Sequence, residues 1–264
     1  MGARQTQGLR LPKPAIIRPA KHWIPYEEAT FPFPLFSPTG GSAPVTDPYF
    51  ANVVLLLGFE GTNGATATTD ESLSAHAMSF QGNAQIDTSQ KKMGTASLLL
   101  DGTADYLTFP ATNDLLFSTG TFTIEGFFRF SATPTNCILL TSWGGGWAFW
   151  FESGKLYFRD GNLHDSGQYT WSPTLNTWYH IAVDRDASNV IRIYVDGVMQ
   201  VKTTGYNYDI PVSATSPAIG SLRNGGFTGF DFNGWMDEIR VTKGVARYGS
   251  DGGLTVPTTA FPRS

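Results

Sequence analysis

The stretch TWYHIAVDRDASNVIRIYVDGVMQV, residues 177–201, decides the fold class. Residues 178–184 and 190–195 are rich in aromatic and β-branched side chains, which favour strands. Residues 186–189 supply a turn between these two strands, and Asp196-Gly197 supplies a second turn that leads into residues 198–201. The stretch therefore predicts two successive β-hairpins.

More strands are predicted on both sides of these hairpins. They are residues 53–59, 97–100, 106–109, 122–129, 138–143, 147–151 and 155–159. Residues 217–221 and 232–241 are expected to be edge or closing strands, and residues 243–248 one helical turn. About twelve strands without a long amphipathic helix predict an all-β fold, with two antiparallel sheets packed face to face.

Composition agrees with a turn-rich β protein and excludes several classes. The 264 residues include 29 Gly and 16 Pro, with 41% apolar and 15% charged side chains. No apolar run is long enough to predict a transmembrane helix. A net charge of −4 without charge runs argues against a nucleic-acid binder. The single Cys137 excludes an internal disulfide and a cysteine-based zinc site.

Residues 1–48 differ from the rest of the chain and are predicted to form an extended N-terminal arm, with the sandwich at 49–264. The arm holds nine of the sixteen prolines, and its five Lys/Arg against three Asp/Glu make it basic. A solvated linker is one interpretation, but the apolar side chains favour an anchor on a partner. The candidate partner-binding residues are Ile16, Ile17, Trp23, Ile24, Tyr26, Phe31, Phe33 and Phe36.

The order of motifs resembles that of laminin-G-like, concanavalin A-like jelly rolls. The motifs are LLLGFEGTNG (55–64), SLLLDGTADYLTFP (97–110), FTIEGFFRF (122–130), TWYHIAVDRD (177–186), IRIYVDGVMQ (191–200) and FNGWMDEIRVTKGVARY (232–248). This resemblance implies a jelly-roll β-sandwich of two curved sheets. It leaves function open, because such folds occur in enzymes, lectins and structural modules.

The acidic residues and histidines do not form a recognisable catalytic set, so a non-enzymatic protein is expected. The sequence lacks the Glu-x-Asp-x-Glu triplet of laminarinase-type glycosidases on this fold. Glu125 stands alone on its strand, and the adjacent Asp237 and Glu238 are expected to point to opposite faces. A structural or metal-supporting role is favoured for Asp237, and a core or hairpin position for His180.

Two kinds of ligand remain open, a carbohydrate and a calcium ion. The best loop aromatics for stacking on a sugar are Trp143, Trp171 and Tyr206, whereas Trp147, Phe149 and Phe151 share a strand face that is predicted to fill the core. The candidate calcium ligands are Asp70, Asp101, Asp231 and Asp237, although turn formation explains most such residues equally well. No cofactor is expected to be required.

A virion structural protein of a tailed phage is the first functional interpretation. Residues 1–17 lack the apolar segment of a signal peptide, which favours assembly in the host cytoplasm. The arm would dock on a major capsid or other virion protein as capsid decoration, cement or a head–tail accessory. The sandwich would project outward in a homo-oligomer such as a trimer. The alternative is a lectin-like adhesion module of a phage fibre or bacterial surface that recognises host glycans.

Overall fold

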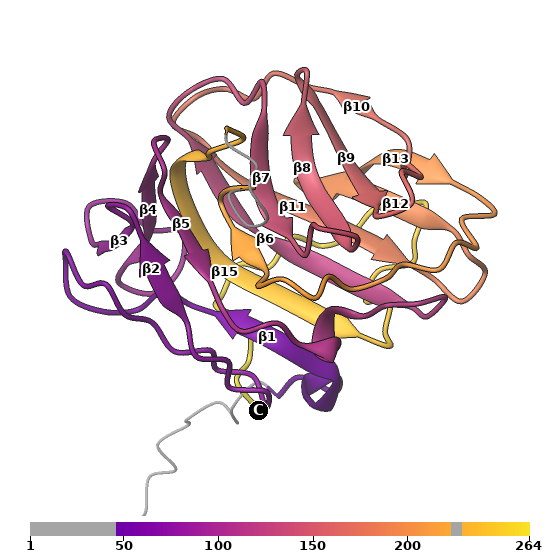
Figure 1. The fold of residues 1–264 in the computed structure, drawn as a ribbon, viewed down its shortest axis with the longest axis horizontal. Coiled ribbons are helices and arrows are strands. Elements are labelled where there is room, and N and C mark those ends of the chain that lie inside the picture. The colour runs from indigo at the N-terminus through magenta and orange to yellow at the C-terminus, as the bar shows by residue number, and fades with distance from the viewer. Residues whose placement is uncertain (1–45, 223–228) are drawn as a thin grey trace, which may run out of the picture. The chain divides into compact units, whose positions relative to one another are not determined.

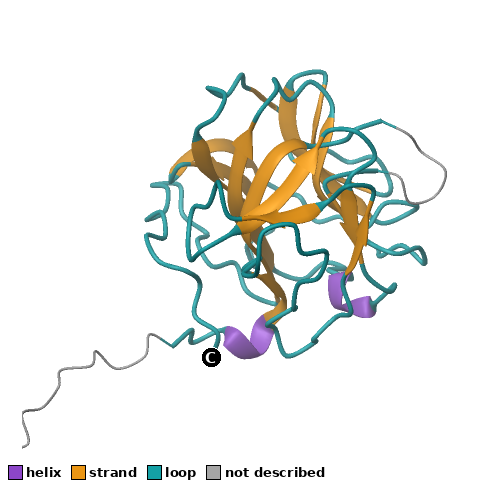
Figure 2. Cartoon of the chain, turned by 90° about the vertical axis from the view of Figure 1, so that its left-hand side faces the viewer, coloured by secondary structure: helices purple, strands orange, loops and turns teal. Residues whose placement is uncertain are grey.

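The computed structural model describes residues 46–222 and 229–264, so the predicted arm residues from Ile16 to Phe36 lie outside the described part of the chain. The described residues form two antiparallel sheets that stack face to face, which confirms the predicted all-β sandwich (Figure 1). Helix is confined to two short 3-10 turns, η1 (Phe50–Asn52) and η2 (Asn113–Leu115), drawn in purple in Figure 2. None of the helical turns described is long and apolar enough to cross a membrane.

The first sheet has eight strands, with β1 paired to β15 beside the main row. The row runs β13 (Val198–Thr203), β12 (Ile191–Val195), β11 (Trp178–Arg185), β6 (Phe122–Phe130), β15 (Asn233–Lys243), β4 (Ser97–Asp101) and β3 (Gln85–Asp87), and β1 spans Val53–Leu57. The predicted double hairpin is confirmed as β11–β12–β13. Asp196 and Gly197 take φ values of 46° and 82°, as a tight turn between twisted strands requires.

The second sheet has seven strands and lies in front of β6 and β11 in Figure 1. Its order is β10 (Tyr169–Thr170), β9 (Lys155–Asp160), β8 (Trp147–Glu152), β7 (Cys137–Thr141), β14 (Ala218–Ile219), β5 (Tyr106–Thr108) and β2 (Ser79–Gln81). The Asp101-Gly102 turn joins β4 of one sheet to β5 of the other. The inner faces of the two sheets meet in one apolar core, which includes Trp147, Phe149 and Phe151, as predicted.

Two predictions at the end of the chain are wrong. The strands predicted at 217–221 and 232–241 do form, but neither is an edge strand, because β14 lies between β7 and β5, and β15 pairs with β6, β4 and β1. Residues 243–248 do not form a helical turn. After Lys243 the chain turns at Gly244, whose φ is 84°, and then crosses β6, where Val245 accepts a hydrogen bond from Thr123.

The outer face of the eight-stranded sheet is buried by other parts of the chain, and we call it the covered face. The segment 244–264 lies over it, with Tyr248 against β6 and β11, Ser250 hydrogen-bonded to Tyr194 of β12, and Phe261 packed on Phe127. Residues 47–52 and 91–93 cover the remainder. A second, smaller apolar cluster therefore forms outside the main core.

An ion-pair network occupies the centre of the covered face around Glu125 of β6. Its carboxylate accepts two bonds from the Arg240 guanidinium, at 3.0 and 2.8 Å, and one from Tyr248. The His180 ring nitrogen lies 3.1 Å away, which places this histidine in the buried interior, as predicted. Burial alone would raise the pKa of Glu125, but the Arg240 charge and these bonds outweigh burial and lower the pKa to about 2.

Asp237 and Glu238 break the regular alternation that the sequence predicts for them. The register of β15 shifts between Asp237 and Arg240, and Glu238 takes a φ of 49°. Asp237 accepts the backbone N–H groups of residues 92 and 93, while Glu238 binds both guanidinium nitrogens of Arg263 at 2.7 Å. Both carboxylates therefore hold segments that lie over the covered face, instead of pointing to opposite faces.

Candidate functional site

The outer face of the seven-stranded sheet carries large apolar side chains, and we call it the open face. Phe151 of β8 packs edge-on against Phe130 of the facing sheet, so the neighbouring residue in the strand, Trp150, points to the opposite, outer face. It stands opposite Ile138 of β7 and Tyr157 of β9. These three outward residues are at most 3% exposed, because other side chains lie over them. The outward-facing side chains of an antiparallel sheet commonly contact solvent, so the burial of these three is unusual.

A cluster of rings and one guanidinium surrounds the Trp150 indole. The Phe230 ring stacks on it with centroids 5.2 Å apart, and the Trp143 ring lies 5.5 Å away. Tyr157 meets the indole edge-on at 5.7 Å, and the Arg159 guanidinium lies 5.6 Å from the ring. Trp143, Trp150, Tyr157, Arg159 and Phe230 are together called the Trp150 cluster. Trp143, Arg159 and Phe230 are partly exposed and form its outer surface.

Among the residues that the structure describes, none accepts a hydrogen bond from the indole nitrogen of Trp150, although the atom is buried. An indole N–H can only donate, and burying it unpaired costs about 1–3 kcal/mol. A tryptophan in a core finds a backbone acceptor, as the Trp147 indole does with the Leu115 carbonyl at 2.9 Å. The unpaired donor of Trp150 thus lies beneath the partly exposed side chains of the cluster.

Charged and polar side chains border the cluster. The Arg159 guanidinium bonds Asp165 at 2.6 Å and lies 3.4 Å from Glu152, which also accepts the Tyr157 hydroxyl. Gln168 donates to Asp165 at 3.0 Å and accepts from Lys155 at 3.1 Å. The Glu152 and Asp165 side chains are 36% and 27% exposed. The border thus offers both donors and acceptors to a ligand seated on the rings.

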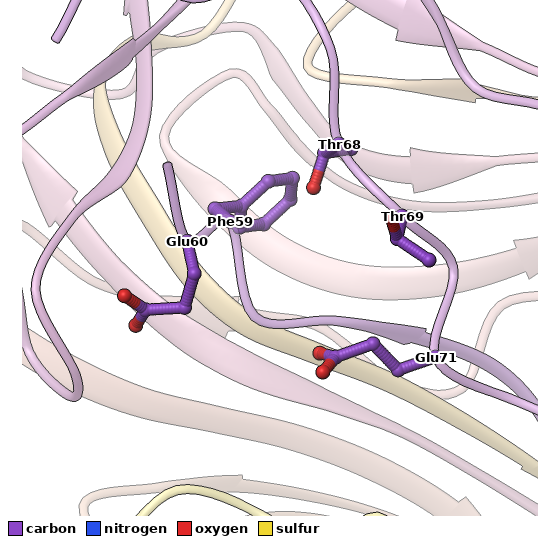
Figure 3. Close-up of a pocket in the computed structure, with 5 residues that line it drawn as sticks. All are labelled: Phe59, Glu60, Thr68, Thr69 and Glu71. Carbon is purple, nitrogen blue, oxygen red and sulfur yellow. The ribbon is translucent and has the colours of Figure 1, made fainter. Parts of the chain in front are cut away.

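One pocket of about 140 Å³ opens elsewhere, beside the loop that follows β1 (Figure 3). It is lined by Phe59, Glu60, Thr68, Thr69 and Glu71. Both carboxylates already bind groups of the protein, Glu60 the backbone N–H of Thr95 and Glu71 the Arg263 guanidinium. The Phe59 ring is only 1% exposed and offers little stacking surface. We therefore place the candidate site on the open face.

The sequence of residues 101–246 matches the family described as the concanavalin A-like lectin/glucanase superfamily. This match covers more than half of the chain, including β6–β9 and β11–β15. The chain belongs to that superfamily. The motifs that suggested a laminin-G-like jelly roll are thereby confirmed, and the protein is a lectin-like jelly-roll domain. No curated protein matches the chain.

Solved structures share the fold of this superfamily member at low sequence identity. The binding domain of Paraclostridial mosquitocidal protein 1 matches with a TM-score of 0.57 and 15% identity, over 75% of this chain and 50% of that one. The binding domain of botulinum neurotoxin serotype D gives 0.58 and 13%, over 76% and 50%. Domain 4 of AbnA, an extracellular GH43 arabinanase from Geobacillus stearothermophilus solved with arabinotriose, gives 0.56 and 15%, over 77% and 94%. The chain spans about half the length of the two toxin domains and nearly all of the arabinanase domain.

The three aromatic residues predicted to meet a carbohydrate are not brought together. Trp143 belongs to the Trp150 cluster. Trp171 is partly buried in another ring cluster, 4.9 Å from Tyr179. Tyr206 is 1% exposed, and its hydroxyl donates to the His164 carbonyl at 2.8 Å. The prediction that Tyr206 offers its ring to a sugar is therefore wrong, because the loop folds this side chain into the core.

The candidate calcium ligands are not gathered into one set either. They are Asp70, Asp101, Asp231 and Asp237, and each carboxylate accepts hydrogen bonds from the protein. Asp70 accepts the backbone N–H groups of Leu56 and Ser72, and Asp101 that of Thr103, as turn residues do. Within the described ranges, no three His, Cys, Asp or Glu side chains are placed to hold a metal ion. The structure thus favours the turn interpretation that the sequence left open.

Trp150, Phe230 and Arg159 were missed by sequence reasoning. The run WAFWFE, residues 147–152, has aromatic residues at positions of both parities, so the strand has apolar side chains on both faces. That pattern was the available signal for Trp150. Phe230 gave none, because its place depends on a loop that returns to β7, where its carbonyl accepts the N–H of Ile138 at 2.9 Å.

Proposed function

We propose that this protein is a carbohydrate-binding lectin-like domain that seats a saccharide on the open face. The observation that carries the proposal is the Trp150 cluster, with a buried indole N–H that no described residue accepts. A sugar ring has an apolar C–H face and a rim of hydroxyl groups. The first suits an aromatic surface, and the second suits neighbouring donors and acceptors.

The outer surface of the cluster is chemically matched to such a ligand. Trp143 and Phe230 offer partly exposed rings, and an oxygen of the sugar would accept the buried Trp150 indole N–H only where these covering rings move aside. Hydroxyl groups would donate to Glu152 or Asp165 and accept from Lys155. The arabinanase domain that was solved with arabinotriose is a relative in fold that is similar over most of its length, and it supports this class of ligand.

We propose further that the open face does not catalyse glycoside hydrolysis. That reaction needs two carboxyl groups with the scissile bond between them. Here the Arg159 guanidinium contacts both Glu152 and Asp165 and occupies the place between them. Sustained release of reducing sugar from an oligosaccharide that binds the open face, lost on Glu152→Gln, would contradict this proposal.

The test is a glycan array followed by calorimetric titration of the best ligand. We expect Trp143→Ala to lower the affinity at least about tenfold, since a stacked aromatic ring and the order of its neighbours are lost. Trp171→Ala is the matched control, because Trp171 is also partly buried in a ring cluster but lies outside the Trp150 cluster. Absence of any sugar binding at millimolar concentration, or equal losses in both variants, would refute the proposal.

The virion role stays a prediction that rests on the sequence of the arm. Its candidate docking residues lie outside the described ranges, and a capsid partner, an oligomer and a virion location are all proposals. Deleting residues 1–45 keeps Asp47, which pairs with Arg240 and Arg247 in the sandwich. The deletion should abolish binding to particles while sparing sugar binding. Full decoration of particles by the deleted form would refute the anchor.

A further inference from the structure

A histidine and a tyrosine form a second ordered surface on loops next to the Trp150 cluster. Tyr208 is 40% exposed, and the His164 ring lies flat on it, with centroids 3.5 Å apart and an interplanar angle of 2°. Tyr206 meets Tyr208 edge-on at 5.1 Å, and Leu163 is 65% exposed beside the histidine. Aromatic and aliphatic surface is thus presented to solvent around one imidazole.

Asp160 fixes the orientation of that imidazole. The Asp160 side chain is fully buried and lies 2.9 Å from Nδ1 of His164. It also accepts the backbone N–H groups of Asn162 and His164, and the Tyr206 hydroxyl, which donates to the His164 carbonyl, lies 3.3 Å from it. A carboxylate of this kind only accepts, so Nδ1 carries a proton, and in the neutral ring Nε2 is the acceptor. Among the described residues Nε2 has no partner, and the side chain is 36% exposed.

The loop that carries Tyr208 is held in place by a buried arginine. Arg185 of β11 is fully buried and donates to the carbonyl of Tyr208 at 2.9 Å. It also donates to the carbonyls of Ser118 and Gly120 on a third loop. The ring pair is therefore ordered before any ligand arrives, which lowers the entropic cost of binding.

The loop that follows Trp143 contacts the loop that carries His164. Gly161 packs so closely on the carbonyls of Gly145 and Gly146 that a side chain at this position would have no room. Trp143 precedes these glycines, and His164 follows Gly161 by three residues. The two surfaces are therefore neighbours with different chemistry.

We propose that Leu163, His164 and Tyr208 form a second saccharide subsite, in which a sugar hydroxyl donates to His164 Nε2 while the apolar face of the sugar packs against Leu163 and the exposed edge of the Tyr208 ring. The inference rests on the proposed function for its ligand class, but none of its residues belongs to the Trp150 cluster. A neutral sugar fits best, because the surface combines one fixed acceptor with apolar area and the nearest carboxylate, Asp160, is already saturated by donors.

The experiment follows both surfaces in one titration of the full chain. Arabinotriose and free galactose, glucose, mannose and N-acetylglucosamine are added at millimolar concentrations. NMR reports the ring signals of His164 and the indole N–H signals of Trp143 and Trp150. We expect at least one sugar to shift the His164 signals.

Two substitutions of His164 test the roles of Nδ1 and Nε2 separately. His164→Asn keeps a donor near Nδ1 for Asp160 but removes the acceptor at Nε2, and should weaken binding at this subsite about tenfold. His164→Gln places an amide oxygen near the Nε2 position and should retain most of the affinity. Tyr208→Phe keeps the ring and should bind as the native chain does, whereas Tyr208→Ala should not.

The outcomes distinguish the two proposals. If sugars shift the Trp143 and Trp150 signals but leave His164 unchanged, or if His164→Asn binds like the native protein, the second subsite is wrong and the proposed function stands. If His164 responds and the tryptophans do not, the second subsite stands and the Trp150 cluster is not the sugar site. If neither responds to any sugar, both proposals fail.

Discussion

The two sheets share one core, but their outer faces differ in what covers them: a long segment of chain lies over one, and a few partly exposed side chains lie over the other. On the covered face, Glu125 is saturated by Arg240, His180 and Tyr248 under a lid of chain. On the open face, the buried indole nitrogen of Trp150 has no partner among the described residues, while rings and charges end at the surface. We infer from this difference that the covered face serves stability, whereas under our proposal the open face serves ligand binding.

The largest expected effect is the loss of the Glu125 carboxylate. In Glu125→Ala the Arg240 guanidinium stays buried without its closest partner, so the free energy of unfolding should fall by about 3–5 kcal/mol. Urea unfolding followed by circular dichroism measures the change. The matched control is Glu152→Ala on the open face, whose carboxylate is partly exposed and also binds an arginine and a tyrosine. Equal losses in the two variants would break the comparison.

The second largest expected effect is a pH dependence of the free energy of unfolding, caused by Asp237 on the covered face. Burial and the neighbouring Glu238 raise the pKa of Asp237 from 3.8 to about 7, although two backbone N–H groups oppose the shift. The folded protein therefore keeps a proton that the unfolded chain releases above about pH 4, and this stabilisation is lost as the pH rises through 7. Between about pH 5 and pH 8 the loss is on the order of 2 kcal/mol.

Asp237→Asn tests this dependence, because the amide stays neutral and its oxygen can still accept the N–H groups of residues 92 and 93. The variant should be more stable than the native protein at about pH 8 and should show a flatter pH profile in urea titrations. Asp101→Asn, in an exposed turn, is the control. An unchanged slope in Asp237→Asn would show that another group sets the pH profile.

A smaller effect is expected where the segment 244–264 is attached at its end. Arg263→Gln removes two bonds to Glu238, whose side chain is only 1% exposed, and should cost about 2 kcal/mol. Hydrogen exchange should speed up first in residues near Phe261, because this packing depends on the same segment. Lys202→Gln, at an exposed ion pair with Asp251, should leave both measurements unchanged. Equal protection in Arg263→Gln and the native chain would show that Phe261 alone holds the segment.

The smallest effect on stability should come from the open face itself. Trp143→Ala is expected to cost only about 1 kcal/mol, because this side chain is partly exposed and covers other rings instead of filling the core. Thermal unfolding measures it beside the sugar titration described above. A loss as large as that of Glu125→Ala would mean that the open face is also built for stability.

Sequence reasoning reached the fold because its signals are local. The Asp196-Gly197 turn and the strand-forming residues around it specify the β11–β12–β13 hairpins without any distant contact. It failed where distant segments decide the outcome. The position of β15 between β6, β4 and β1 is set by pairing across most of the chain, and the burial of Tyr206 depends on His164 and Asp160. The Trp150 cluster needed both kinds of information, and only Trp143 was predicted.

The central position of β15 also bears on how the protein is made. This strand is synthesised after β1, β4 and β6, yet all three pair with it. Asp47 likewise meets Arg240 and Arg247 across 193 and 200 residues. Each of these early strands must therefore keep at least one edge unpaired until β15 has been synthesised, so folding should be slow. Nascent chains that stop before β15 are where aggregation or a chaperone requirement should first be seen.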